Sequence, residues 1–215
     1  MLQVRFNMSN HTFKLCHNIG LYPIVDHSLW VSNLAKYGVR TIQLRIKNVD
    51  LNVIENEIIK SIEIANTHSI RLFINDHWFL AIKHKAYGVH LGQEDLLTAD
   101  IKAIWQSGLM LGLSTHSNVE LAIAREYNPS YLALGPIFPT TSKIMPFAPQ
   151  GVTRLQEWKN QIKCPLVAIG GINLNNIDTI LATGHKDIAL ISAITKSVNP
   201  KEATQLLLHR IANYA

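Results

Sequence analysis

The sequence predicts an α/β fold, a (β/α)8 TIM barrel built as a single domain, and three observations support this. The chain has 215 residues and is 47% hydrophobic against 16% charged, which suits one large domain with a sizeable core. Eight short apolar runs alternate with longer amphipathic stretches. The segment that follows the first run, residues 26–30, lacks the glycine-rich loop expected of an open dinucleotide-binding sheet.

The expected strands are short and rich in aliphatic and β-branched residues. Near-continuous apolar runs of this kind are typical of parallel strands that are covered on both faces. The eight runs are 21–25, 41–46, 71–74, 88–91, 111–114, 131–134, 166–169 and 188–191.

Helical periodicity lies between these runs. In residues 52–65, isoleucine and valine recur at the spacing of one helix face. Eight such units favour a closed barrel over an open, doubly wound sheet. The expected helices are 30–36, 52–65, 78–83, 100–105, 119–126, 154–161, 176–181 and 202–212.

The barrel domain is expected to span residues 20–215, with residues 1–19 as an N-terminal extension that could cover its bottom. Residues 1–19 lack the continuous apolar region of a signal peptide. No apolar run approaches the roughly 18–20 residues needed to cross a bilayer. We therefore expect a cytoplasmic protein that is not bound to a membrane.

Charge and cysteine content exclude some classes of function. The formal net charge is +5, but the 20 Lys and Arg are dispersed, without a basic run of five or more residues. This distribution argues against nucleic-acid binding and suits small anionic ligands. The two cysteines, Cys16 and Cys164, show no metal or redox spacing and are expected to be reduced and structural. The sequence predicts no oligomeric state.

The second expected strand ends in polar residues, at the point where the ligand chemistry of such barrels is found. Alternation along the strand places Gln43, Arg45 and Lys47 on one face. Two cations and an amide on that face need an anion as a partner. The alternative is that they are ion-paired inside the barrel.

Asp76 and Asp95 follow the third and fourth expected strands. Carboxylates on neighbouring strand ends can converge on one hard cation, and Mg²⁺ is usually held by one or two carboxylates together with substrate phosphates. Each aspartate could instead cap a helix, as Asp95 would if a helix began near Leu97. The cations of the second strand favour the Mg²⁺ site.

A second group of polar residues follows the fifth to eighth strands. Ser114 and Thr115 either bind phosphate or cap a helix that begins near Asn118. A long connection then runs to Gly151, and long loops in compact domains often act as lids. Glycines after the seventh strand would let the backbone approach an anion. These candidate phosphate ligands are Thr140, Thr141, Ser142, Lys143, Gly170, Gly171 and Ser192.

Seven short motifs resemble those of the thiamine-phosphate synthase family, and the resemblance covers most of the chain, roughly residues 20–194. They are QLRIK at 43–47, IND at 74–76, GVHLGQED at 88–95, STH at 114–116, GPIFPTTSK at 135–143, AIGGI at 168–172 and ISAI at 191–194. The segment APQG at 148–151 is similar to Gram-negative members. One departure is Ser142, where the family usually has a threonine; the hydroxyl is kept.

The resemblance implies an enzyme that joins hydroxymethylpyrimidine diphosphate to thiazole phosphate, or to its carboxylated precursor, and releases pyrophosphate with the help of Mg²⁺. It implies Mg²⁺ ligation by Asp76 and Asp95 and catalytic roles for Arg45, Lys47, Ser114 and Lys143. The pyrimidine diphosphate would be bound by Gln43, Leu44, Arg45, Ile46, Lys47, Asn75, Ser114 and Lys143. The thiazole phosphate would be bound by Thr140, Thr141, Ser142, Gly170, Gly171, Ile191 and Ser192.

The implied reaction resembles a dissociative displacement that needs no protein nucleophile or strong base. His90 and His116 are therefore expected to be packing or surface residues. For His90, which lies at a strand end, a catalytic role stays open. Two alternatives remain: a thiazole tautomerase-like barrel, and a barrel that binds a phosphorylated ligand without catalysis. An aldolase or epimerase is disfavoured, because no lysine is placed as a Schiff base and no set of histidines as metal ligands.

Overall fold

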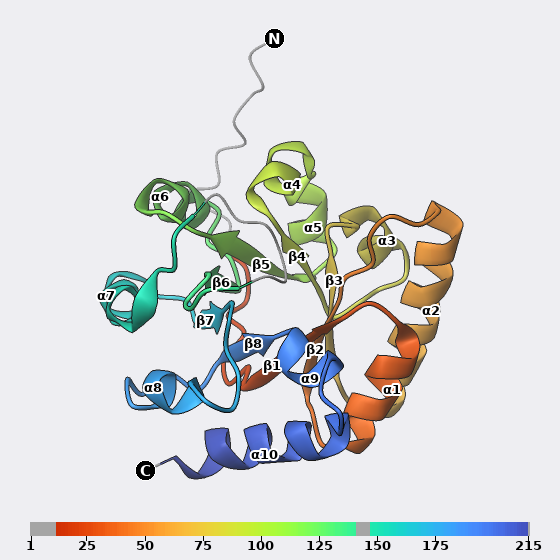
Figure 1. Ribbon diagram of the computed structural model, residues 1–215. Coiled ribbons are helices and arrows are strands. Elements are labelled where there is room, and N and C mark those ends of the chain that lie inside the picture. Colours follow the sequence, from red (N-terminus) through yellow and green to blue (C-terminus); the bar gives the residue numbers. More distant parts are fainter. Residues whose placement is uncertain (1–11, 141–146, 215) are drawn as a thin grey trace.

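The computed structural model describes residues 12–140 and 147–214, and it confirms the predicted barrel (Figure 1). Each strand pairs with the next in parallel, and β8 pairs with β1 to close the sheet. The strands are β1 Leu21–Val25, β2 Thr41–Leu44, β3 Arg71–Asn75, β4 Gly88–Leu91, β5 Met110–Thr115, β6 Tyr131–Leu134, β7 Leu166–Ile169 and β8 Ile188–Leu190.

The expected second strand is two residues too long, because β2 ends at Leu44. Its neighbour β1 ends at Val25, which lies opposite Leu44. Residues after Leu44 therefore have no β1 residue opposite them to extend the parallel pairing. Arg45 still donates its backbone N–H to the carbonyl of Val25, at 2.7 Å. The chain therefore leaves the sheet with Arg45 and Lys47 at the mouth of the barrel.

The helices surround the barrel, as Figure 1 shows, and all eight expected helices are present. Two short helices that were not expected, α4 and α9, begin directly after β4 and β8. The helices are α1 Ser28–Lys36, α2 Leu51–Thr67, α3 Trp78–Lys83, α4 Gln93–Thr98, α5 Ile101–Gln106, α6 Asn118–Glu126, α7 Gly151–Gln161, α8 Ile177–Leu181, α9 Ser192–Thr195 and α10 Pro200–Asn213.

Helix α2 shows how the sequence specifies one of these elements. Asp50 caps its start by accepting a hydrogen bond from the backbone N–H of Asn52, at 2.8 Å. The residues buried along it include Ile54, Ile58 and Ile62, at the spacing of one helix face. This apolar stripe packs the helix against the outside of the sheet, and its polar face remains in solvent.

A second, smaller core fills the inside of the barrel. Tyr22, Phe73 and Tyr131 meet there edge to face, with ring centroids 5.2–5.9 Å apart. Gly112 leaves the space that the Tyr131 ring occupies, since a Cβ on Gly112 would lie 2.2 Å from it. The barrel is thus a packed core, and open space begins only above these rings.

Residues 12–19 run across the end of the barrel where the strands begin. Phe13 and Cys16 donate backbone hydrogen bonds to Asn128 and Ser130, at 3.1 and 3.0 Å, and Arg71 donates to the carbonyl of His17 at 2.8 Å. The side chains of Phe13 and Cys16 are buried. Residues 12–19 therefore cover the end of the barrel where the strands begin. The boundary between the extension and the barrel domain at residue 19 stays a prediction. Cys16 and Cys164 are free cysteines.

No helix within the described ranges is both long and apolar enough to cross a membrane.

Candidate active site

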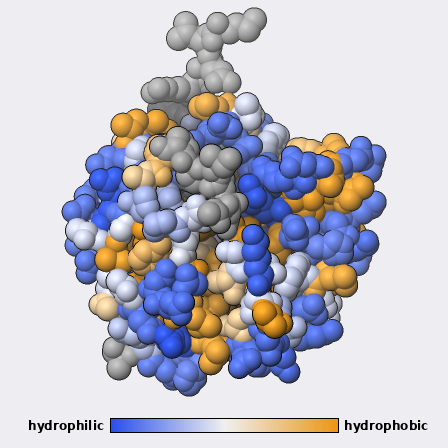
Figure 2. Space-filling view, viewed as in Figure 1, coloured by the Kyte–Doolittle hydropathy of each residue, from blue (hydrophilic) through white to orange (hydrophobic). Residues whose placement is uncertain are grey.

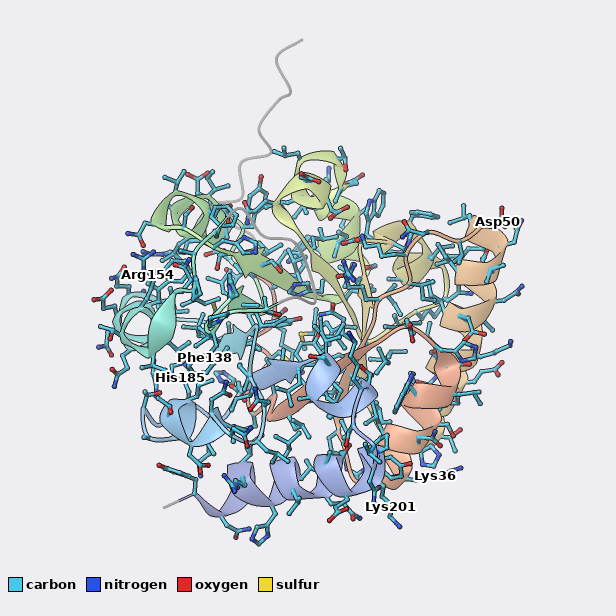
Figure 3. The ribbon with its side chains drawn as sticks, viewed as in Figure 1. Lys36, Asp50, Phe138, Arg154, His185 and Lys201 are labelled. Carbon is cyan, nitrogen blue, oxygen red and sulfur yellow. The ribbon has the colours of Figure 1, made fainter. Side chains whose placement is uncertain are left out.

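A cavity of about 520 Å³ opens at the end of the barrel where the strands finish. Figure 2 shows this face, on which hydrophilic side chains surround the rim with hydrophobic residues between them. Charged side chains such as Lys36, Asp50 and Lys201 lie at the periphery, on the outer helices (Figure 3). Ten of the predicted residues line the cavity: Gln43, Arg45, Lys47, Asn75, Asp76, Asp95, Ser114, Thr140, Gly170 and Ile191.

The structure places the three alternating residues at the end of β2, Gln43, Arg45 and Lys47, on the side of the cavity, as predicted. Gln43 lies at the floor, only 2% exposed, and Arg45 and Lys47 line the wall above it. Lys47 forms an ion pair with Asp76. Leu44 and Ile46 alternate with these residues and are buried in the main hydrophobic core, so their side chains are absent from the described cavity lining.

Asp76 and Asp95 both line the cavity, and neither is a helix N-cap. Asp95 lies in the first turn of α4, whose N-cap is Gly92, so the alternative of a helix beginning near Leu97 is wrong. Asp76 precedes His77, the N-cap of α3, and adopts φ 64°. Few non-glycine residues occupy this left-handed region, and such conformations cluster at functional sites.

The two carboxyl groups influence each other's ionisation. Burial, and then the charge of Asp76, raise the pKa of Asp95 above its ordinary value. Burial also raises the pKa of Asp76, but hydrogen bonds from Lys47 and Asp95 outweigh it and leave that pKa below its ordinary value. Two carboxyl groups this close are destabilised when both are charged, and a divalent cation would remove that cost.

This donor set fits Mg²⁺ better than a metal that is held by protein ligands alone. In the described part of the chain, no group of three or more His, Cys, Asp or Glu could hold a metal ion. Two carboxylates are the usual protein contribution to a Mg²⁺ ion that is also bound by substrate phosphates, and here they share the cavity with Arg45 and Lys47.

The two hydroxyl residues that end β5 have different surroundings. Ser114 lines the cavity and its Oγ lies 2.8 Å from His90 Nε2. Thr115 is buried and donates to the carbonyl of Ala133, at 2.9 Å. Helix α6 is capped by Ser117, whose Oγ accepts from the N–H of Glu120, so the expected alternative of a cap from Ser114 or Thr115 is wrong.

His90 lines the cavity and is 5% exposed. Burial lowers its pKa to about 4, so the imidazole is neutral at physiological pH. Its ring stacks on Tyr131, with centroids 5.6 Å apart. These contacts agree with a packed residue, but they also place the ring beside Ser114.

The opposite side of the cavity is formed by the loops after β6, β7 and β8. Thr140, Gly170 and Ile191 line it, and Gly171 and Ser192 are their chain neighbours outside the lining. Thr141, Ser142 and Lys143 lie outside the described residues. The structure therefore places some of the predicted phosphate-binding residues together at the cavity, and the role of the others stays a prediction.

The paired glycines are required by contact between two loops. Gly170 and Gly171 have φ of 96° and 69°, and a Cβ on Gly171 would lie 2.4 Å from the carbonyl oxygen of Pro139. A Cβ on Gly170 would lie 2.6 Å from Pro136. The β7 loop thus presses against the β6 loop and fixes its position beside the cavity.

Several lining residues had no predicted binding role, and four of them bear on the shape of the cavity: Gln93, His116, Glu120 and Phe147. Gln93 donates to the carbonyl of Ser114, at 2.6 Å. His116 directly precedes Ser117, the N-cap of α6, and Glu120 lies in the first turn of that helix, a spacing of four residues that could have predicted their contact. Phe147 follows the long connection, and no local pattern in the sequence links it to the cavity.

Comparison with known proteins agrees with this geometry. The family model "Thiamine monophosphate synthase" matches residues 21–194. Thiamine-phosphate synthase of Yersinia pseudotuberculosis (serotype O:1b) is 53% identical over 194 residues, 90% of each chain. The protein of the same name from Photorhabdus laumondii is 52% identical over 196 residues, 91% of each chain.

A solved structure shows the same likeness in three dimensions. Thiamine phosphate pyrophosphorylase from Pyrococcus furiosus has a TM-score of 0.79 and 29% identity, over 90% of this chain and 96% of that one. The matched residues contain the strand ends that form the cavity. On this evidence the chain belongs to the thiamine monophosphate synthase family.

Proposed function

We propose that this protein is a transferase that joins hydroxymethylpyrimidine diphosphate to thiazole phosphate, or to its carboxylated precursor, and forms thiamine phosphate. The C–O bond between the pyrimidine methylene and the diphosphate breaks, a C–N bond to the thiazole nitrogen forms, and pyrophosphate leaves. One observation carries the proposal: Arg45 and Lys47 line the same cavity as Asp76 and Asp95, and Lys47 is ion-paired with Asp76.

The diphosphate lies on the β2–β4 side of the cavity. Asp76 and Asp95 would hold Mg²⁺, which neutralises charge on the departing pyrophosphate when it is bound. Arg45 and Lys47 place two further cations there, and preorganised cations stabilise charge as it develops. Lys143 completes the cationic set, a role that rests on the family motif.

The pyrimidine ring lies above the floor of the cavity, against Gln43, Asn75 and Ser114. All three line the cavity, and Gln43 and Asn75 are 2% and 7% exposed. Since the side chains of Leu44 and Ile46 point into the core, these two residues contribute through their main chain.

The thiazole phosphate lies against the loops after β6, β7 and β8. Its proposed ligands are hydroxyl groups and loop backbone, which suit a phosphate ester. They are Thr140, Thr141, Ser142, Gly170, Gly171, Ile191 and Ser192.

The surroundings suit a dissociative step without a protein nucleophile. Neither cysteine is among the cavity-lining residues of the described chain. His90 is neutral and hydrogen-bonded on both ring nitrogens, which gives it no free position for proton transfer. The protein's part is to place two substrates and to stabilise a leaving group.

The two alternative functions account for less of the cavity. A tautomerase acting on one thiazole phosphate would have no use for two carboxylates beside Arg45 and Lys47. A non-catalytic phosphate sensor would not need groups that stabilise a departing pyrophosphate.

The direct test is to incubate the pure protein with both substrates and Mg²⁺ and to measure thiamine phosphate and pyrophosphate together. We expect equimolar products that require both substrates and the metal. Asp76→Asn should abolish turnover or raise the Mg²⁺ requirement. Glu126→Gln, an exposed change on α6, serves as its control. Absence of product with fresh substrates and metal would exclude the synthase function. The cytoplasmic location stays a prediction.

A further inference from the structure

A chain of hydrogen bonds crosses the interior of the barrel beneath the cavity. Gln43 Nε2 donates to Tyr22 Oη at 3.1 Å, and Tyr22 Oη lies 2.8 Å from Tyr131 Oη. Tyr131 Oη lies 2.8 Å from His90 Nδ1, and His90 Nε2 lies 2.8 Å from Ser114 Oγ. The two ends, Gln43 and Ser114, line the cavity. The two tyrosines are buried, at 1% and 0% exposure.

Counting hydrogens fixes the direction of this chain. Tyr22 already accepts from Gln43, and its one acceptor within the described network is Tyr131. A buried hydroxyl hydrogen without an acceptor is costly, so Tyr22 donates to Tyr131. Tyr131 has then a single acceptor left, His90 Nδ1, and must donate to it.

The state of His90 follows from the same count. Because Nδ1 accepts from Tyr131, the ring carries its hydrogen on Nε2 and donates it to Ser114 Oγ. A hydrogen on Nδ1, in either the other tautomer or the cation, would force Tyr131 to donate to Tyr22 and leave the Tyr22 hydrogen unsatisfied. Ser114 therefore keeps its own hydroxyl hydrogen for the cavity.

Gln43, at the other end of the chain of hydrogen bonds, offers the cavity an acceptor where Ser114 offers a donor. With its Nε2 committed to Tyr22, Gln43 has its amide oxygen to offer to a ligand as an acceptor. If the amide were turned over, Tyr22 would donate to Gln43, and every bond up to Ser114 would reverse. Ser114 would then donate to His90 and offer only its lone pairs to the cavity.

We propose that Tyr22 and Tyr131 are positioning residues that couple Gln43 to Ser114, so that the cavity presents one acceptor and one donor in a fixed order. The inference rests on the proposed function, since this order suits the edge of an aminopyrimidine, where an amino donor adjoins a ring-nitrogen acceptor. A ring with an oxo group and an adjacent N–H requires reversal of the whole chain and is disfavoured.

The tautomer of His90 can be measured without any ligand. In protein labelled with ¹⁵N-histidine, the His90 signals are identified by their loss in His90→Gln. We expect a neutral ring with the hydrogen on Nε2 and a hydrogen-bonded, unprotonated Nδ1. A hydrogen on Nδ1, or on both nitrogens, would overturn the proposal. Because no substrate is present, this result is independent of whether the protein makes thiamine phosphate.

Ligand selectivity tests the coupling itself. Two unreactive pyrimidine diphosphate analogues, one with the amino group and one with an oxo group in its place, are compared as competitive inhibitors. We expect the wild type to prefer the amino ligand by about tenfold or more, as hydrogen-bonding sites do. Tyr131→Phe should reduce that preference severalfold, because Gln43 and Ser114 can then reorient separately, and should shift the Nδ1 signal towards an unbonded nitrogen.

Tyr87→Phe is the matched control. Tyr87 contacts Phe73 edge to face, with centroids 5.5 Å apart, in the same aromatic group but outside the chain of hydrogen bonds. It should keep both the His90 signals and the amino preference. A folded Tyr131→Phe protein with wild-type selectivity would overturn the coupling. If thiamine phosphate does not form while His90 shows the expected tautomer, the proposed function fails and the hydrogen-bond order stands.

Discussion

The ring of His116 stacks face to face on Phe147, with centroids 4.9 Å apart and planes 4° from parallel. His116 is itself held by Glu120, whose carboxylate accepts from the backbone N–H of His116 at 2.7 Å and lies 2.8 Å from its Nδ1. The stack joins the loop after β5 to the chain just before α7, and both rings line the cavity. It thereby fixes one end of the long connection after β6.

Phe147→Ala should raise the KM of at least one substrate by about three- to tenfold, with a smaller change in kcat. The reason is that an aromatic pair contributes about 0.5–1.5 kcal/mol, and its loss frees the wall of the cavity. Steady-state kinetics with each substrate varied in turn gives the measurement. Phe147→Tyr keeps the ring and should stay near wild type; an unchanged KM in Phe147→Ala would show that the stack does not hold the cavity.

Asp95→Asn should raise the Mg²⁺ concentration for half-maximal activity by about tenfold or more, since the proposed metal ligand loses its charge. The stability of the metal-free protein should not fall, because the change also removes a carboxyl group whose pKa is raised by burial and by Asp76. Activity against Mg²⁺ concentration and urea unfolding give the two measurements. Should the metal dependence match that of Glu126→Gln, Asp95 would not be a ligand.

Gly171→Ala should destabilise the protein by about 2–4 kcal/mol, through a backbone clash added to left-handed strain. It should also raise the KM of the thiazole phosphate, because Pro139 and the adjacent Thr140 must move. Gly184→Ala separates the two causes. Its φ of 75° is similar, but a Cβ there would meet only Lys159 Nζ, at 3.6 Å. We expect about 1 kcal/mol of strain for it. Equal losses in urea unfolding would refute the contact between the loops.

His185 should make the protein less stable in mild acid. It is 4% exposed and lies beside α8 (Figure 3), and burial lowers its pKa to about 4. In the unfolded chain histidine has a pKa near 6.5. Between about pH 6.5 and pH 4 the unfolded state therefore binds a proton that the native state does not bind. Stability contributed by the neutral ring is therefore complete above about pH 6.5 and is lost as the pH falls towards 4.

His185→Gln should remove about 1–2 kcal/mol of the stability difference between pH 7 and pH 5, after allowance for partial screening by solvent. Urea unfolding at both pH values gives the measurement. The exposed His68 provides the control variant, His68→Gln, which should keep the wild-type difference. If His185→Gln also kept it, the imidazole would be protonated in the folded protein.

Much of the fold follows from local pattern. The bounds of β1, β4, β6 and β7 agree with the expected runs, because each is a short, mostly apolar segment that is followed directly by a glycine or an aspartate. Helices α4 and α9 were not predicted. The first has polar residues through its first turn, and the second has only 4 residues, too few to show a period.

From the residue pattern, site residues could be predicted only where polar or charged side chains lie at the end of an expected strand. Gln43, Arg45 and Lys47 follow from alternation, and Asp76 and Asp95 from their places after neighbouring strands. Phe147 could not be predicted, because its partner lies 31 positions earlier and only the folded loops bring the rings together. The tyrosines inside the barrel look like ordinary core residues in the sequence, since their hydroxyl partners are on other strands.

The segment of residues 12–19 closes one end of the barrel, where Arg71 holds its carbonyl groups. In the described structure the cavity opens at the opposite end. Two substrates and two products must therefore use the same passage. A segment remote from the reacting atoms thus makes each product a competitor for the route by which the next substrate arrives.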